Sequence, residues 1–166
     1  MQMIHTRDRA GYTELFNTER RYALRLAYVL TGDHDLAEEV VADAFVHMYP
    51  QWQRSRIDDP HAYLRRAVIN EVNSAFRRRE VRRRPVRAER PRVASGADTG
   101  VDDRDAVQHA LLQLPVRQRA AVALRYLEDL SERETAEALG MSVGSVKSQV
   151  SRGLDRLRGI LEGDAQ

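Results

Sequence analysis

The chain has 166 residues, of which 42% are hydrophobic and 6% aromatic, enough for one domain or two small ones with mostly aliphatic cores. It contains no cysteine, which excludes disulfides and thiolate metal sites or nucleophiles. The 27 basic and 25 acidic residues nearly cancel, and no apolar run reaches the roughly 18 residues of a membrane span. Because the N-terminal segment lacks an apolar signal-peptide core, the chain is expected to be cytoplasmic, with no membrane insertion.

The charges are segregated along the sequence. Between Arg65 and Arg92 there are eleven arginines and three acidic residues, whereas Asp33 to Asp43 carries five acidic side chains and no lysine or arginine. Separate acidic and basic regions indicate two different partners, one of them polyanionic. For the basic stretch after Glu80, a solvated linker is the alternative interpretation.

The first predicted helix runs from about Tyr12 to Leu30, where apolar residues recur at helical spacing. Gly32 is predicted to stop it, as glycine past a helix end usually does. A second helix follows at once, and Asp35 and Glu38 are predicted to form a capping box at its start. Pro50 is predicted to end this helix.

A third helix is predicted from His61, directly after Pro60, to about Arg79. Since no strand-like alternation appears, residues 1–80 are predicted to be a small helical domain. Residues 81–103 hold prolines and glycines but almost no large apolar side chains. They cannot bury enough surface to fold alone and are predicted to be a flexible linker.

Residues 104–166 are predicted to form a second helical domain. Pro115 is well placed to open a helix after the first one. Ser131 and Glu134 make a second predicted capping box, and Gly140 ends the helix that they begin. The next helix follows after a short turn, so this domain ends in a helix-turn-helix. The predicted fold class is all-α, with two small helical domains joined by a flexible linker.

The final helix is predicted from Val143, capped by Ser142, to about Leu161. On a helical wheel its apolar residues fall on one side and are predicted to face the core: Val143, Val146, Val150, Leu154, Leu157 and Leu161. The other side carries short and long hydrogen-bonding groups: Ser145, Lys147, Ser148, Gln149, Ser151 and Arg152. This chemistry suits the DNA major groove, with the long side chains at base edges and the serines on phosphates. An ordinary solvated face is the alternative, but no acidic residue follows Ser142 before Asp155.

Several runs resemble bacterial sigma factors of the extracytoplasmic-function (ECF) class, within the sigma-70 superfamily. LSERETAEALGMSVGSVKSQVSRGLDRLR resembles their C-terminal DNA-binding domain. LTGDHDLAEEVVADAFVHMY and PHAYLRRAVINEVNSAFRRR resemble their N-terminal domain. The matches cover both predicted domains in the expected order. The resemblance implies a protein that binds the clamp and flap regions of core RNA polymerase, directs it to promoter DNA and helps to melt the −10 element.

The resemblance also implies roles for individual residues. The second helix would bind the polymerase clamp through Glu38, Glu39 and Asp43. The third helix would capture the −10 element as a single strand and hold its backbone, with Tyr63, Arg65, Arg66, Asn70, Arg77 and Arg78. The final helix would read the −35 element with the polar residues named above. The chain departs from many members at Ala42-Asp43, where they have Gln-Glu, and in the basic first half of its linker.

Two other interpretations compete with this one. Glu39, Asp43 and His47 share one helix face with a spacing that could bind a metal, although a solvated acidic face is favoured. With no phosphate-binding loop and no nucleophile motif, neither enzymatic activity, a cofactor nor a small-molecule substrate is expected. A stand-alone helix-turn-helix regulator is the nearer alternative, but it leaves the first domain unexplained. An anti-sigma factor, where one exists, is expected to cover the clamp-binding and DNA-reading faces.

Overall fold

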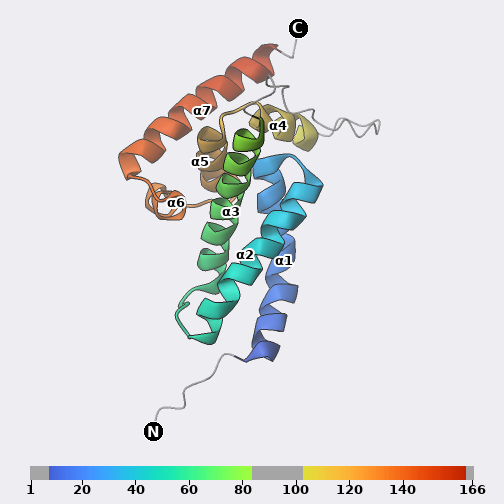
Figure 1. Cartoon of the computed structure of the whole chain (residues 1–166). Helices are drawn as coiled ribbons and strands as arrows, with labels where there is room; N and C mark the ends of the chain where they lie inside the picture. The colour runs from blue at the N-terminus through green and yellow to red at the C-terminus, as the bar shows by residue number, and fades with distance from the viewer. Residues whose placement is uncertain (1–7, 84–102, 164–166) are drawn as a thin grey trace. The chain divides into compact units, whose positions relative to one another are not determined.

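The computed structural model describes residues 8–83 and 103–163, and residues 84–102 of the predicted linker lie outside them. The described residues form seven helices and no strand (Figure 1). The chain divides into two compact units, one built on α1 to α3 and the other on α4 to α7. The helices are α1 (Arg9–Thr31), α2 (His34–Gln53), α3 (Pro60–Arg83), α4 (Asp103–Leu112), α5 (Val116–Tyr126), α6 (Glu132–Leu139) and α7 (Val143–Gly163).

In the first unit, α1, α2 and α3 run lengthwise beside one another (Figure 1). All three contribute buried aliphatic side chains to its core: Leu26, Val40, Val41, Met48, Leu64, Val68 and Val72. Aromatic rings join α1 to α2, with the Phe16 and Phe45 centroids 4.8 Å apart. The Tyr12 hydroxyl donates to the Phe45 carbonyl. Burial raises the pKa of Tyr12 to about 12, with smaller contributions from Tyr49 and Tyr63, so this hydroxyl remains a donor at neutral pH.

Asp33 caps the amino end of α2, so the predicted capping box of Asp35 and Glu38 is wrong. The Asp33 carboxylate accepts the Leu36 N–H at 3.0 Å. That bond is the main reason that the pKa of Asp33 is lowered. Glu38 instead lies 3.6 Å from Arg20 of α1. Asp33 also follows Gly32, whose φ of +69° ends α1 as predicted.

Helix α2 continues through Pro50 to Gln53, so the predicted end at Pro50 is wrong as well. A proline costs the helix one backbone donor, and here that loss falls close to its end. The Pro50 carbonyl still accepts the Arg54 N–H at 3.3 Å. Helix α3 continues to Arg83, past the predicted end near Arg79, so residues 81–83 are helical rather than linker.

In the second unit, α7 packs across α4, α5 and α6. Its core joins residues of α4, of the turn after it, of α5 and of α7: Leu111, Leu114, Val122, Leu154, Leu157 and Ile160. Gly153 is buried against α5, where an added Cβ would lie 2.7 Å from Cγ2 of Val122. The close approach of the two helices therefore depends on the missing side chain. Two residues predicted in the core are exposed, Val143 at 39% and Leu161 at 44%, because the packed side of α7 is centred on Val146 and Gly153.

Arg119 of α5 is buried and fixes the turn that follows α4. The carbonyls that accept from its guanidinium include those of Leu111 at 2.9 Å, Leu112 at 2.9 Å and Leu114 at 3.0 Å. Burial lowers the pKa of Arg119 to about 10, which leaves the group charged at neutral pH. A cation among the last carbonyls of a helix is stabilised by their partial negative charge.

The helix-turn-helix ends form as the sequence predicts. Ser131 Oγ accepts the Glu134 N–H at 3.2 Å, and the Glu134 carboxylate accepts the Ser131 N–H at 2.8 Å. Gly140 ends α6 with φ +62°. Ser142 Oγ then accepts the Ser145 N–H at 3.1 Å and begins α7. These predictions are confirmed.

Candidate nucleic-acid and polymerase interfaces

The polar side of α7 is open to solvent. Ser145, Lys147, Ser148, Ser151 and Arg152 are exposed, and Gln149 is half-buried at the edge of this face. Val146, on the opposite side, is fully buried and fixes the orientation of the helix. These six polar side chains therefore share one accessible face, which offers donors and acceptors over about two helical turns.

Lys147 stands at the edge of this face nearest to α6. Its Nζ lies 3.6 Å from Oε2 of Glu132, which belongs to the first turn of α6. Ser145 also has a neighbour, because its hydroxyl lies 2.9 Å from that of Ser142. Two of the six polar residues are thus positioned by groups outside the face.

Helix α3 carries a stripe of polar residues on successive turns. Tyr63, Arg66, Asn70 and Arg77 are separated by three, four and seven positions, so they lie on one side of the helix. Tyr63 is half-buried and the other three are exposed. Asn73 is exposed on the same stripe, and sequence reasoning missed it. Its spacing, three from Asn70 and four from Arg77, was the signal that could have found it.

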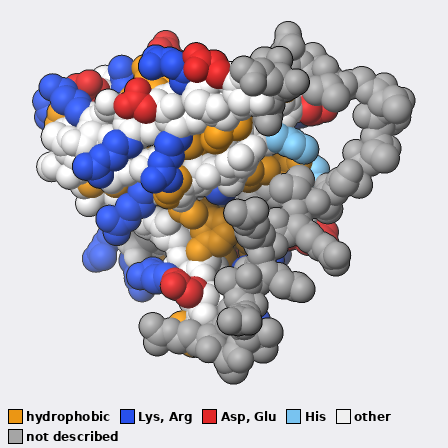
Figure 2. Space-filling model, turned by 90° about the horizontal axis from the view of Figure 1, so that it is seen from above, with side chains coloured by type: hydrophobic (Ala, Val, Ile, Leu, Met, Phe, Trp, Pro, Cys, Tyr) orange, Lys and Arg blue, Asp and Glu red, His pale blue; other side chains and the backbone are white. Residues whose placement is uncertain are grey.

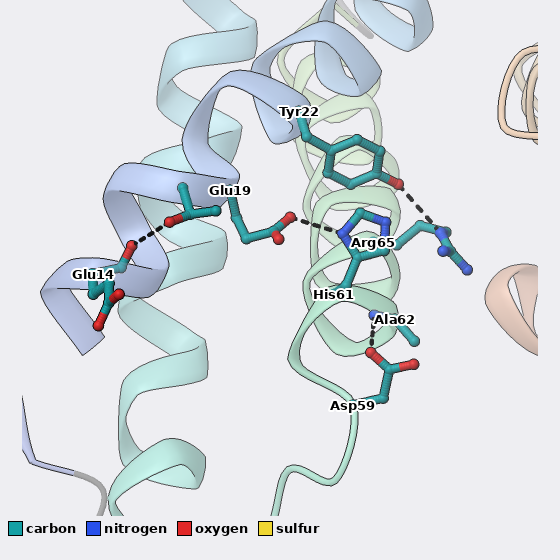
Figure 3. A network of polar contacts seen from close by, with 8 residues as sticks. Glu14, Glu19, Tyr22, Asp59, His61, Ala62 and Arg65 are labelled. Atoms are coloured by element: carbon teal, nitrogen blue, oxygen red, sulfur yellow. Dashed lines mark hydrogen bonds and ion pairs between the residues drawn. The ribbon is translucent and has the colours of Figure 1, made fainter. Parts of the chain in front are cut away.

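Arg65 does not belong to that stripe. Its Nε donates to the Tyr22 hydroxyl of α1 at 3.2 Å (Figure 3). In the preceding turn of α3, His61 Nδ1 lies 2.7 Å from Oε2 of Glu19, and its ring is centred 4.3 Å from that of Tyr22. The same figure shows Tyr22 reaching from α1 to the Arg65 side chain. The structure therefore separates Arg65 from the other predicted −10 residues, while Arg78 is exposed beside the stripe.

The exposed side of α2 combines acidic and apolar groups. Glu39 is exposed and Asp43 half-buried, and among the described residues no cation lies within ion-pair distance of either. Glu38 is the exception among the three predicted clamp residues, because it pairs with Arg20. Val46 is 67% exposed on the same side, and sequence reasoning missed it. A valine four residues after Ala42 on a polar face was the available signal.

His47 faces a different neighbour from Glu39 and Asp43. Its Nδ1 lies 2.7 Å from Oε1 of Glu71 on α3. Within residues 8–83 and 103–163, no three histidine, aspartate or glutamate side chains are grouped to hold a metal ion. The His47 ring is therefore engaged by α3.

Trp52 packs against α1. Its ring is centred 5.6 Å from that of Tyr12, and its Nε1 donates to the Asp8 carbonyl at 3.3 Å. Tyr63 is the aromatic residue that remains on the α3 stripe.

Figure 2 shows lysine and arginine side chains projecting from the face that it presents, with acidic side chains among them. None of the described helices combines the length and hydrophobicity needed to cross a membrane.

Two family models match the chain in order. Sigma-70 region 2 matches residues 15–82 and Sigma-70, region 4 matches residues 104–157. The RNA polymerase sigma-E factor of Streptomyces avermitilis is 35% identical over 154 residues, which are 91% of this chain and 85% of that protein. The ECF RNA polymerase sigma factor SigM of Mycobacterium tuberculosis is 31% identical, over 93% of this chain and 79% of that protein. The chain belongs to the ECF class of the sigma-70 family.

This sigma factor also shares its fold with a solved relative. The sigma factor RpoE of Bartonella quintana, crystallised with the anti-sigma factor NepR, has a TM-score of 0.73 and 24% identity, over 92% of this chain and 97% of that one. The chain accordingly binds core RNA polymerase and directs promoter recognition and transcription initiation. A stand-alone regulator is not favoured, because the region 2 match accounts for the first unit. Sigma factors are initiation factors rather than enzymes.

Proposed function

We propose that this sigma factor performs initiation through three exposed helix faces. The acidic side of α2 binds the polymerase clamp, the polar stripe of α3 binds the −10 element, and the polar side of α7 reads the −35 element. The observation that carries the proposal is the α3 stripe, on which amides and guanidinium groups share one exposed side next to an aromatic ring.

The α3 stripe has the chemistry needed to hold a melted strand. Opening a duplex costs a few kcal/mol per base step, so bases must be captured once they are unstacked. Tyr63 offers a ring for stacking, and Asn70 and Asn73 offer amides for base edges. Arg66 and Arg77 stand at either end of these amides, where they can pair with phosphates; Arg78 adds a further charge beside them.

The α7 face has the chemistry needed to read a duplex. Arg152, Lys147 and Gln149 are long enough to reach base edges in the major groove. Ser145, Ser148 and Ser151 are short and stand on the early turns, where hydroxyls bind phosphates. The buried Val146 and Gly153 fix how this face is presented.

The α2 face suits a protein partner with basic and apolar groups. Glu39 and Asp43 supply charge for orientation, and Val46 supplies apolar area between polar neighbours. Asp43→Arg should weaken polymerase binding without changing the DNA contacts of α7. Val46→Asp should do the same through loss of apolar contact, and it tests a residue that the charge pattern alone does not suggest.

An inhibitor of this sigma factor would act on the same faces. The Bartonella quintana relative was solved with an anti-sigma factor. We expect an anti-sigma factor of this chain to cover the α2 face and the promoter-binding sides of α3 and α7, because one protein then blocks both partners. A factor that works with RNA polymerase and promoter DNA acts in the cytoplasm, and the proposed mechanism requires no catalytic residue in this chain.

Run-off transcription on fragmented genomic DNA tests the proposal. Core polymerase is supplied with or without the chain, and the 5′ ends of the transcripts are sequenced. We expect new start sites that share two upstream boxes. Asp43→Arg should abolish them with loss of polymerase binding, whereas Arg152→Ala should weaken them with polymerase binding intact. If both variants lose only DNA binding, the assignment of separate faces is wrong.

A further inference from the structure

Lys147 is the one lysine among the 27 basic residues of the chain. Its Nζ lies 3.6 Å from Oε2 of Glu132, with side chains 62% and 42% exposed. The two residues come from different helices of the helix-turn-helix, Lys147 from α7 and Glu132 from the first turn of α6. The ion pair therefore joins the proposed −35 reading face to its neighbouring helix.

The carboxylates of α6 have different partners. Glu134 accepts the Ser131 N–H at 2.8 Å and so closes the capping box. Glu137 lies 3.4 Å from Nε of Arg133, one turn away on the same helix. Glu132 reaches α7. The ion pair of Glu132 with Lys147 does not contribute to the capping box of α6. Its role must therefore lie in its effect on Lys147.

A lysine ammonium is a compact charge on a flexible stem, and at a DNA surface the nearest phosphate attracts it whatever the sequence. A carboxylate beside it opposes that movement. We propose that Glu132 is a positioning residue, which keeps Lys147 from neutralising a backbone phosphate and leaves it directed at the base edges of the −35 element. This inference rests on the proposed function of α7.

The test uses the full chain assembled with core polymerase. The probes are a labelled duplex that carries the upstream box found by run-off transcription and a duplex of equal length with that box scrambled. Glu132→Gln should strengthen binding to the scrambled duplex and lower the ratio of specific to non-specific affinity by about two- to fivefold, the range of an exposed ion pair. The log–log salt slope on the scrambled duplex should steepen by about 0.9, because Lys147 gains one phosphate.

Glu137→Gln is the matched control, since it removes the same charge from the same helix without touching Lys147. It should leave the salt slope and the specificity ratio unchanged. Glu132→Asp keeps the charge but shortens the side chain, so the carboxylate no longer reaches Lys147. Its ratio of specific to non-specific affinity should therefore fall as for Glu132→Gln. In the Lys147→Ala background, Glu132→Gln should no longer change the slope.

The outcomes separate this inference from the function on which it rests. Equal effects of Glu132→Gln and Glu137→Gln, or an effect that persists without Lys147, would show that the carboxylate repels DNA directly and would overturn the inference alone. Lys147→Ala could leave the affinity for both the promoter and the scrambled duplex unchanged while Arg152→Ala weakens binding to the promoter duplex. Lys147 would then lie outside the reading face, and the inference would fail. If Arg152→Ala is also without effect, the proposed function of α7 fails.

Discussion

Helices α3 and α7 are both assigned to promoter DNA, yet their units hold them in different ways. Helix α7 packs along one side, so most of its polar residues point to solvent. Helix α3 is held by α2 and also by α1, through the contacts of Glu71 with His47 and of Arg65 with Tyr22. A helical wheel predicts exposure well when a helix has one packed side. When a helix has two packed sides, some side chains of a given type remain exposed while others bond to a neighbouring helix.

The one-sided packing of α7 can be broken at Gly153. We expect Gly153→Ala to lower the free energy of unfolding by about 1–3 kcal/mol, because its Cβ would lie 2.7 Å from Cγ2 of Val122 and force α7 away from α5. Gly159→Ala is the control on the same helix, since nothing lies within 4 Å of its added Cβ. That variant should be more stable by about 0.5–1 kcal/mol, from helix propensity alone.

Denaturant unfolding of the full chain measures both changes, and hydrogen exchange locates them in α5 and α7. If Gly153→Ala stabilises the protein as much as Gly159→Ala, the close approach of α7 to α5 is not a requirement of the fold. The presentation of the reading face would then need another explanation.

The division of the α3 arginines can be tested with Arg66→Ala and Arg65→Ala. Arg66 is exposed on the stripe, so its loss should lower the log–log salt slope of promoter binding by about 0.9, equivalent to one phosphate. Arg65 is engaged by the Tyr22 hydroxyl, so its loss should change the slope less and the stability of the first unit more. The measurement is binding of the polymerase complex to a promoter duplex with a preformed bubble. Equal slopes for the two variants would place Arg65 on the DNA after all.

Helix α6, on which α7 packs, contains a buried polar group whose removal should stabilise the protein. The Thr135 hydroxyl is buried and makes no hydrogen bond within the described residues. Thr135→Val keeps the shape and removes this unpaired group, so the free energy of unfolding should rise by about 1 kcal/mol. Thr18→Val is the control, because the Thr18 hydroxyl is exposed and donates to the Glu14 carbonyl at 2.9 Å. An unchanged Thr135→Val variant would indicate that water or a rotated side chain satisfies the hydroxyl.

The parts of the fold that the sequence predicts are those decided within a few residues. Ser131 with Glu134, Gly140 and Ser142 act on the adjacent backbone, and all of them act as predicted. The choice between Asp33 and Asp35 as the cap of α2 was also local, but both are aspartates at a helix start and the pattern selected the wrong one.

The remaining features depend on which helices meet. Gly153 has no side chain by which a wheel could assign it to a face, yet the approach of α5 makes it part of the core. Arg65 and Arg66 are neighbours of identical chemistry, and the position of Tyr22 on α1 separates them. The family resemblance predicted which helices carry the candidate site. It could not predict which side chains of those helices are held by neighbours.

The smallest expected effect concerns the start of α2, where Asp33 caps the helix and lies 3.5 Å from Arg79 of α3. The Leu36 N–H, followed by Arg79, lowers the pKa of Asp33. The ionised carboxylate therefore stabilises the fold above the ordinary aspartate pKa, and this contribution is lost as the pH falls through the lowered value. Asp33→Asn keeps a capping oxygen but removes the charge, so the start of α2 should be slightly less stable at pH 7 and equal to the unmodified chain in acid. Hydrogen exchange of the first turn of α2, followed from pH 7 to below the lowered pKa of Asp33, measures this difference. If Asp33→Asn remains less stable than the unmodified chain in acid, the shape of the side chain, rather than its charge, stabilises this contact between α2 and α3.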